Sequence, residues 1–519
     1  MAQSIELDVQ KSFTLSYAES LDAQDPLRPL REEFIIPTRA NLKRKRLGDE
    51  GTIVELSEKI NALLPENDVT YPSTYLCGNS LGLQPRCTQE YVRKYLDTWA
   101  YKGVYGHFQE LEDAVSRPWV DVDEDAKRET AMIVGARPDE VAVMETLTAN
   151  LHLLMASFYR PTKDRYKIII EGKAFPSDHY AVQSQLHHHN LTPQAALVEL
   201  TPPDPATAYL PTDYILSVID AHADSTALLL LPGIQYYSGQ FFDMARITAH
   251  AHARGITVGW DLAHAVGNVP LELHAWGVDF AAWCNYKYMN SGPGAIGGLF
   301  VHEKHTRVEA STTTTTDTVV SAETLGYRPR LSGWWGSAKS SRFQMTSTFA
   351  PIPGAAGFQL SNPSVLDTTA LLASLSVFAQ TSMPALRAKS LKLTAYLEHL
   401  LFARSPTETA DTAAARPYVL LTPHDPAQRG AQLSLRLRPG LLEPVMRDLE
   451  AAGVVVDERR PDVVRVAPAP LYNGFADVWR FVREFKGACR RAVEAGAGGG
   501  EAGTTTTHHH NQNQPHATT

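Results

Sequence analysis

The sequence predicts an α/β protein in which a large, doubly wound and mainly parallel sheet domain is followed by a smaller α+β C-terminal domain. Between residues 140 and 302, short apolar runs alternate with helical stretches, which is typical of parallel strands joined by right-handed crossovers. From about residue 366 the pattern changes to amphipathic helices and then to short strands. A chain of 519 residues also exceeds one usual core, so two domains with extensions are expected.

Four segments follow from these changes in pattern. Residues 1–70 are a predicted N-terminal helical arm, with helices expected at 12–27 and 53–64, and residues 71–365 are the large domain. Residues 366–492 are the small domain, and residues 493–519 are predicted to be a disordered tail. A Thr-rich stretch at residues 311–318 is interpreted as a low-complexity insertion.

The apolar runs of the large domain are short and are bounded by Gly, Pro and Asn, which indicates buried strands rather than helices. The expected strands are Glu140–Met144, Lys167–Glu171, Ala227–Leu231, Ile256–Trp260, Val278–Trp283 and Ala295–Val301. Helices are expected at Leu151–Tyr159 and Met244–Arg254, and the small domain should contain strands at Tyr418–Leu421, Ala431–Leu437 and Asp462–Pro468.

The composition excludes several classes of partner. A net charge of −9 argues against binding to nucleic acid or to an anionic membrane surface. No run of eighteen apolar residues exists, and the acidic N-terminus has no apolar signal-peptide core. The four cysteines form neither a disulfide framework nor a metal-ligand spacing, so no metal site is predicted and a cytoplasmic location fits best.

Two charged residues stand at the ends of predicted strands. Asp261 ends one strand, with His264 three residues later, and Lys287 follows the next strand. Open α/β sheets bind ligands at the carboxyl ends of their strands. An amine and a carboxylate there suit pyridoxal phosphate, because the lysine forms an imine and the aspartate keeps the ring nitrogen protonated. The alternative is a surface lysine in a loop and an aspartate that caps a helix.

Two further strand ends carry polar or aromatic groups. Thr148 begins a helix after a strand, where a hydroxyl and free backbone N–H groups could bind an anion or merely cap the helix. Phe175 follows another strand and could stack on a flat ring, and Asp178 could bind that ring or cap its helix. Cys284 is interpreted as a small residue at a buried strand end.

Four strings closely resemble the kynureninases, pyridoxal-phosphate enzymes of the aspartate-aminotransferase fold type (PLP fold type I). They are YLCGNSLGLQP at 75–85, DLAHAVGN at 261–268, GVDFAAWCNYKYMNSGPG at 277–294 and RVAP at 465–468. The resemblance covers about residues 70 to 490. It implies a pyridoxal 5'-phosphate site made of Leu147, Thr148, Phe175, Pro176, Ser177, Asp178, Asp261, His264, Tyr286, Lys287, Trp334 and Asn362. Where other members carry Ser, this chain has Pro232.

The resemblance also implies a dimer and a substrate pocket. Trp334 and Asn362 would reach the cofactor from the partner subunit, so the active sites of a homodimer would be shared. Ser80 and His107 would surround the substrate's aromatic ring, and Arg465 would bind its α-carboxylate. A guanidinium inside an apolar strand is costly unless an anion meets it, which agrees with that role.

The implied reaction is hydrolysis of L-kynurenine or 3-hydroxy-L-kynurenine to anthranilate or 3-hydroxyanthranilate plus L-alanine, in tryptophan catabolism and de novo NAD biosynthesis. Lys287 would act as base, Asp261 would keep the ring charged, and Tyr286 would relay protons. One alternative is a cysteine desulfurase or aminotransferase relative, although no cysteine lies in a Gly/Ser-rich loop. Another is a cofactor-binding regulatory protein without turnover.

Overall fold

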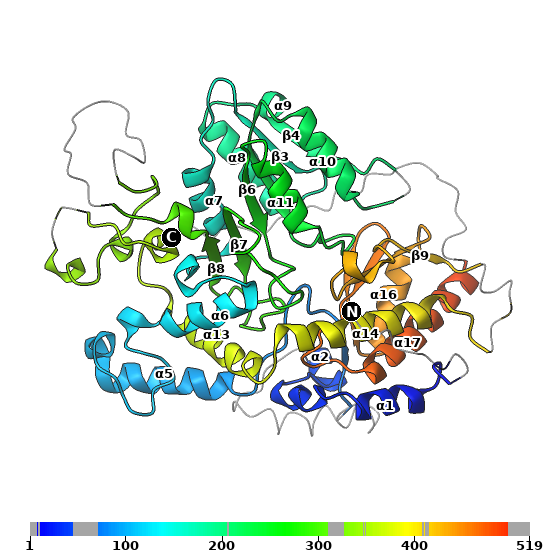
Figure 1. The fold of residues 1–519 in the computed structure, drawn as a ribbon. Helices are drawn as coiled ribbons and strands as arrows, with labels where there is room; N and C mark the ends of the chain where they lie inside the picture. Colours follow the sequence, from blue (N-terminus) through cyan, green and yellow to red (C-terminus); the bar gives the residue numbers. More distant parts are fainter. Residues whose placement is uncertain are drawn as a thin grey trace, which may run out of the picture.

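The computed structural model describes residues 8, 11–44, 71–204, 207–309, 326–345, 347, 349–406, 409 and 415–496 (Figure 1). Two predicted segments lie outside the described residues, the arm helix at 53–64 and the Thr-rich stretch at 311–318, and so does most of the tail predicted at 493–519. The start predicted for that tail is too early, because residues 493 and 494 still belong to the last helix (Phe475–Glu494). The other arm helix is α1 (Leu15–Ala23), and α2 (Arg39–Lys43) follows it.

A seven-stranded sheet forms the centre of the described chain (Figure 1). Its strands in spatial order are β2 (Val141–Val143), β8 (Gly297–Val301), β7 (Phe280–Cys284), β6 (Thr257–Asp261), β5 (Thr226–Pro232), β3 (Lys167–Glu171) and β4 (Leu197–Leu200). Neighbours from β7 to β4 pair in parallel, whereas β8 runs antiparallel to both of its neighbours. This mainly parallel sheet confirms the predicted α/β class. The edge strand β4 was not predicted.

Helices cover both faces of this sheet. Along β3 and β5, Ile168 and Leu228 belong to one buried cluster and Ile169 and Leu229 to another, as the two-residue period of a strand requires. The first cluster packs under α7 (Leu147–Phe158) and α8 (Pro176–His188). The second packs under α6 (Glu124–Val134), α10 (Thr212–Ala221), α11 (Met244–His252) and α13 (Val365–Phe378).

Short elements complete this region. They are β1 (Thr74–Tyr75), α5 (Thr88–Lys102), α9 (Pro193–Ala196) and the 3-10 helices η1 (Arg28–Glu33), η2 (Gly103–His107), η3 (Trp119–Asp121), η4 (Pro138–Glu140), η5 (Glu303–His305), η6 (Trp334–Gly336), η7 (Arg342–Gln344) and η8 (Ala355–Phe358). Among the described residues no single helix is long and apolar enough to cross a membrane. By length and composition α13 and α14 (Met383–Phe402) pass that test only as a pair, bent by 77°.

A second, antiparallel sheet lies towards the C-terminus. Its order is β12 (Asp457–Arg459), β13 (Val463–Val466), β10 (Leu433–Leu437) and β9 (Tyr418–Leu420). The helices α14, α16 (Leu442–Ala451) and α17 (Phe475–Glu494) share a buried cluster with this sheet, and Ala18 of α1 joins it. The short strand β11 (Val454–Val455) pairs in parallel with β1. In Figure 1 the blue α1 accordingly lies below the orange and red C-terminal elements.

The predicted domain division at residue 366 stays a prediction. Helix α13 contributes Leu371 and Leu375 to the core of the large sheet, and α14 adds Leu386 to that core. The later residues of α14, such as Leu393 and Leu397, belong to the second core. One helix therefore links the two cores.

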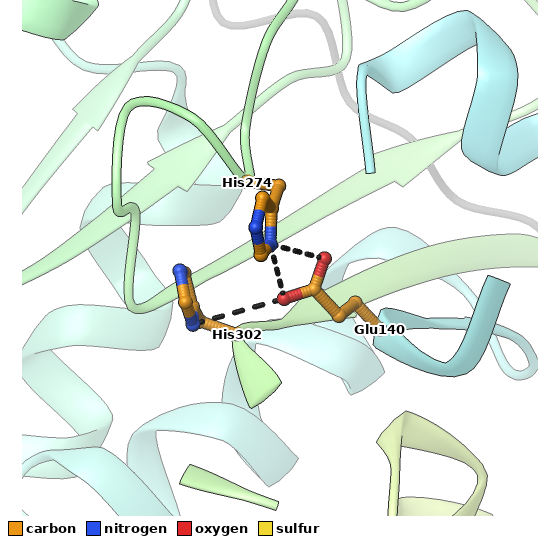
Figure 2. Close-up of side chains that lie close together, drawn as sticks. All are labelled: Glu140, His274 and His302. Carbon is orange, nitrogen blue, oxygen red and sulfur yellow. Dashed lines mark hydrogen bonds and ion pairs between the residues drawn. The ribbon is translucent and has the colours of Figure 1, made fainter. Parts of the chain in front are cut away.

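Glu140 ties three elements of the large sheet together (Figure 2). Its carboxylate accepts the backbone N–H groups of Arg137 at 3.0 Å and Glu303 at 2.9 Å, and it bonds His274 Nδ1 at 2.9 Å. His302 lies stacked on His274, with ring centroids 5.0 Å apart. Glu140, His274 and His302 bring three possible ligand atoms within 4.8 Å of one another. Two backbone N–H groups and one imidazole already bond this carboxylate, so we interpret the group as a structural junction between η4, the loop after β6 and the end of β8.

Candidate active site

The carboxyl ends of β5, β6 and β7 open into one pocket. Asp261 is the last residue of β6, is 6% exposed, and accepts the backbone N–H of Ala263 at 2.8 Å. Lys287 follows β7 by three residues. The pocket is lined by Thr146, Leu147, Thr148, Ala174, Phe175, Ser177, Asp178, Pro232, Ile234, Tyr236, Asp261, Ala263, His264, Tyr286 and Lys287. Most of the cofactor residues expected from the sequence thus meet in one place.

The amine of Lys287 lies between aromatic rings. Its Nζ is 5.9 Å from the ring centroid of Phe175 and 5.8 Å from that of Tyr286. Burial raises the pKa of the Tyr286 phenol, so that group stays protonated. Cys284 is buried at the end of β7, and burial raises the pKa of its thiol, which confirms its interpretation as a strand-end residue.

Asp261 and Asp178 line the pocket with this amine, and a third acid, Glu171, ends β3, the strand next to β5. Burial, reinforced by the neighbouring charge of Asp261, raises the pKa of Asp178 well above its ordinary range. Burial also raises the pKa of Glu171, at the end of β3, to about 7. One oxygen of Asp178 and one of Glu171 have no hydrogen-bond partner among the described residues.

His264 is neutral in this setting. Burial, together with the charges of Lys287, Arg465 and Arg459, lowers its pKa well below the ordinary value. Its Nδ1 is buried and has no hydrogen-bond partner in the described part of the chain. A buried imidazole with an unused nitrogen beside a free amine indicates a place for a polar ligand.

Two helices begin at the far end of the pocket. The N-caps of α7 and α8 are Thr146 and Phe175, and neither side chain bonds the first turn of its helix. Thr148 Oγ1 and Ser177 Oγ, one from each first turn, lie 2.6 Å apart. Uncapped N–H groups and two hydroxyls at converging helix N-termini form a suitable seat for a phosphate.

Arg465 reaches the pocket region from the second sheet. It lies on β13, is 1% exposed, and donates from Nη1 to the carbonyl of Tyr236 at 2.8 Å. Its Nη2 donates to Ser80 Oγ at 3.2 Å and forms an ion pair with Asp457. The anion that meets this guanidinium is therefore Asp457, where the sequence led us to expect the substrate carboxylate.

Several predicted residues lie away from the pocket of their own chain. Pro176 is the first residue of α8 and does not line it. Trp334 is 45% exposed and packs on Phe343, with ring centroids 5.7 Å apart. His107 bonds the carbonyl of Val104 at 3.1 Å. Asn362 is partly exposed and does not line the pocket either.

Other residues near the pocket were missed by the sequence analysis: Glu171, Tyr236, Asp457 and Arg459. Glu171 and Tyr236 follow or end apolar strands, the same signal that identified Asp261. Asp457 and Arg459 alternate along one strand, and such a pattern is common on ordinary exposed strands. Their pairing with Arg465 becomes visible only when β12 and β13 are placed side by side.

The pocket fits pyridoxal phosphate. It offers an anion seat at the start of α7 and α8, a free amine, a carboxylate at a strand end, and an aromatic ring. The buried unpartnered atoms His264 Nδ1 and Asp178 Oδ1 supply polar groups for a heterocycle. Pyridoxal phosphate uses a lysine amine for its imine and an acidic partner for its ring nitrogen, and this pocket supplies both.

Sequence comparisons agree with this geometry. The family model described as Kynureninase C-terminal domain matches residues 386–485, and that described as Aminotransferase class-V matches residues 85–331. "Kynureninase 1" of Aspergillus oryzae is 58% identical over 485 residues, covering 93% of this chain and 95% of the relative. "Kynureninase" of Coccidioides immitis is 57% identical over 487 residues, covering 94% and 96%.

Solved structures share the fold at much lower identity. The E. coli cysteine desulfurase CsdA aligns with a TM-score of 0.61 at 17% identity, covering 84% of this chain and 98% of that one. A mutant of the C-DES protein, with glycine covalently linked to its PLP cofactor, aligns with a TM-score of 0.63 at 14% identity, covering 80% and 96%. These two proteins therefore share an architecture with this chain, whereas its high-identity relatives are kynureninases. This chain belongs to the kynureninase family.

Proposed function

We propose roles for the residues of this pocket in the hydrolysis of L-kynurenine and 3-hydroxy-L-kynurenine. Family membership at 58% identity over nearly the whole chain supports this activity, with pyridoxal phosphate as cofactor. One water is consumed, the bond between the β- and γ-carbons breaks, and the products are anthranilate or 3-hydroxyanthranilate plus L-alanine. Through this reaction the chain serves tryptophan catabolism and de novo NAD biosynthesis.

Lys287 is the proposed attachment point of the cofactor and the base that takes the substrate's α-proton. When bound, pyridoxal phosphate supplies an aldehyde for the substrate amine and a ring that accepts electrons from the α-carbon. The position of Lys287 supports its role, because Nζ lies in the pocket near the ring of Phe175. Tyr286 keeps its proton because burial raises its pKa, so it can donate a hydrogen bond to the phosphate and pass protons on.

Asp261 is proposed to hold the proton of the pyridine nitrogen. The raised pKa of Asp178 supports this role, because a neutral Asp178 beside Asp261 leaves one negative charge on the pair. The Asp261 carboxyl group lines the pocket from the end of β6. His264, held neutral by burial and the surrounding cations, adds a flat uncharged ring beside it.

Thr148, Ser177 and the first turns of α7 and α8 are proposed to bind the phosphate, with Leu147 contributing its backbone N–H. The 2.6 Å contact between the two hydroxyls supports a shared anion site. Arg465 is proposed to bind the substrate α-carboxylate, with Ser80 beside it. Arg465 lies on β13 of the second sheet and bonds the carbonyl of Tyr236, a residue that lines the pocket.

We also propose a homodimer in which Trp334, Asn362 and His107 complete the partner's site. Within one chain these residues do not line the pocket; Trp334 belongs to an exposed aromatic cluster with Phe108 and Phe343, and the His107 ring lies 5.9 Å from that of Phe108. Ring centroids of Phe108 and Phe343 lie 5.3 Å apart, and those of Trp334 and Phe343 lie 5.7 Å apart. An exposed apolar patch of this kind supports a protein–protein interface.

A cytoplasmic location is proposed on the chemistry of the cysteines. Cys77, Cys87, Cys284 and Cys489 are all free thiols. Unpaired buried thiols are usual in reducing compartments, which supports this location.

One observation carries the proposal: a lysine amine and an aspartate carboxylate from adjacent parallel strands line the same pocket as two uncapped helix N-termini. Borohydride reduction of the holoenzyme followed by peptide mapping should place the cofactor on Lys287. Lys287→Ala should lose this label and at least about 10²-fold in kcat, measured by anthranilate fluorescence. A label on another lysine would refute the assignment. A labelled chain inert with both substrates would favour a regulatory protein without turnover.

A further inference from the structure

Asp457 forms an ion pair with Arg465, the residue to which we assign the binding of the substrate carboxylate. Its Oδ2 contacts both Arg465 Nη2 and Ser80 Oγ. Its Oδ1 accepts from Arg459 Nη1 at 2.6 Å. One carboxylate is thus shared between two guanidinium groups, each of which bonds a different oxygen.

The strand geometry explains this sharing. Asp457 pairs directly opposite Arg465 across β12 and β13. Arg459 lies two residues beyond Asp457 on the same strand, and side chains two apart in a strand point to the same face. Asp457, Arg459 and Arg465 therefore converge on one face, while Glu458 between them points away and pairs with Arg460.

The three side chains differ in exposure, from the fully buried Arg465 to the partly exposed Arg459. The side chains of Arg465, Asp457 and Arg459 are 1%, 15% and 32% exposed. Although burial opposes it, Arg465, Ser80 and Arg459 together hold the pKa of Asp457 below its ordinary value, so the carboxylate stays charged at neutral pH. Arg465 Nε is buried and has no partner among the described residues, which leaves a donor free for a second anion.

We propose that Asp457 is a placeholder for the substrate carboxylate: it neutralises Arg465 in the free enzyme and moves fully onto Arg459 when substrate binds. This inference deepens the proposed function and rests on the role of Arg465 given there. Asp457 is a positioning residue, because it acts through Arg465 and need not touch the reacting atoms.

The exchange keeps every buried charge paired. In the free enzyme Asp457 spares Arg465 the cost of a buried, unpaired cation. An arriving carboxylate would be repelled by Asp457 if it stayed in place, but Arg459 already holds its other oxygen. After the exchange each guanidinium faces one carboxylate, and the Ser80 hydroxyl is released to the substrate.

Because Asp457 competes with the substrate carboxylate for Arg465, removing its charge should lower KM. In the holoenzyme, Asp457→Asn should lower KM for kynurenine by about fivefold or more, because binding no longer has to displace a resident anion. Arg459→Gln should act in the opposite direction and raise KM, because Asp457 then has no other partner. The inhibition constant of kynurenine α-carboxamide, which carries no negative charge, should change little in either variant.

A double variant tests whether Arg459 acts by receiving Asp457 or by binding the substrate directly. In the Asp457→Asn background, Arg459→Gln should have no further effect on KM, because residue 457 then has no carboxylate for Arg459 to bind. An equal effect in both backgrounds would mean that Arg459 binds substrate itself and would overturn the exchange. Glu458→Gln is the matched control: it removes the same charge from the same strand but from the other face, and KM should not change.

Two outcomes identify which idea fails. Arg465→Lys should raise KM for kynurenine but leave the carboxamide unaffected; if it does not, the proposed role of Arg465 is wrong. If that result holds but Asp457→Asn leaves KM unchanged or raised, Asp457 stays on Arg465 when substrate binds. Only the displacement of Asp457 is then refuted, and the role of Arg465 stands. If circular dichroism shows that Asp457→Asn does not fold, the test rests on Arg459→Gln alone. An unchanged KM in Arg459→Gln would then overturn the proposal.

Discussion

At the scale of single residues, burial decides which acids near Lys287 carry charge. Asp261 ends a central strand and lines the pocket with Lys287, whereas Asp178 and Glu171 each have a buried oxygen that lacks any partner in the described residues. Desolvation favours the neutral form of such groups. Burial of Asp178 therefore favours a single negative charge on the Asp178–Asp261 pair, where we propose that the pyridine nitrogen lies.

Glu171 should make the enzyme less stable as the pH rises. Its folded pKa of about 7 exceeds the ordinary 4.5, so between these values the folded chain holds a proton that the unfolded chain has released. Stability therefore falls across this window, and the full cost remains above pH 7. Glu171→Gln should raise the free energy of unfolding at pH 8, by up to about 3 kcal/mol, and by less at pH 5.

Urea unfolding at both pH values measures this difference. The substituted amide keeps an oxygen for Gln235, which donates to Glu171 Oε1 at 2.8 Å. Glu199→Gln, on the adjacent strand β4 but exposed, is the control and should show no pH-dependent gain. A gain for Glu171→Gln that is the same at pH 5 and pH 8 would contradict the raised pKa.

At the scale of elements, the ends of parallel strands carry the residues of the pocket, and Glu140 holds an antiparallel strand of the same sheet in place. Glu140 fixes η4 against the end of β8, which is the antiparallel neighbour of β7 (Figure 2). Removing its charge leaves two backbone N–H groups and His274 competing for a weaker acceptor.

Glu140→Gln should therefore destabilise the fold by about 2–3 kcal/mol at pH 7. Although burial opposes it, these hydrogen bonds hold the pKa of Glu140 below its ordinary 4.5. The contribution is thus fully present above pH 4.5 and is lost as the pH falls towards the folded pKa. The difference between the two proteins in unfolding free energy should narrow below pH 4.5, and a constant difference would exclude the carboxylate as its source.

The sequence was informative where a local pattern determines the structure. Apolar runs predicted β3, β5, β6, β7 and β8, and the residues at their ends predicted the Asp261 and Lys287 pocket. Strand β4 was missed because its residues, Leu197–Leu200, are partly exposed at the sheet edge and lack a continuous apolar run. Asp457 was missed because its role depends on which strand lies beside it. Contacts between distant segments leave no mark in a single sequence.

At the scale of the whole molecule, the residues to which we assign binding roles come from two sheets. The large sheet carries Lys287, Asp261 and the phosphate seat, and the second sheet carries Arg465 and Asp457. Helix α14 packs in both cores and links them. The exposed aromatic cluster of Phe108, Trp334 and Phe343 belongs to neither core, which is why we assign it to a second copy of the chain.

The shared active site can be tested by complementation between two inactive variants. Lys287→Ala and Trp334→Ala should each be inactive alone, but co-expression should form mixed dimers in which one site has Lys287 from one subunit and Trp334 from the other. Half of the dimers are mixed and one of their two sites is intact, so about a quarter of the wild-type kcat should return. Lys287→Ala with Asp261→Asn is the matched control: both residues line the pocket of one chain, so every mixed site keeps one defect and no activity should return. If Trp334→Ala likewise fails to complement Lys287→Ala in dimers purified with two different tags, Trp334 serves its own subunit and the sites are not shared.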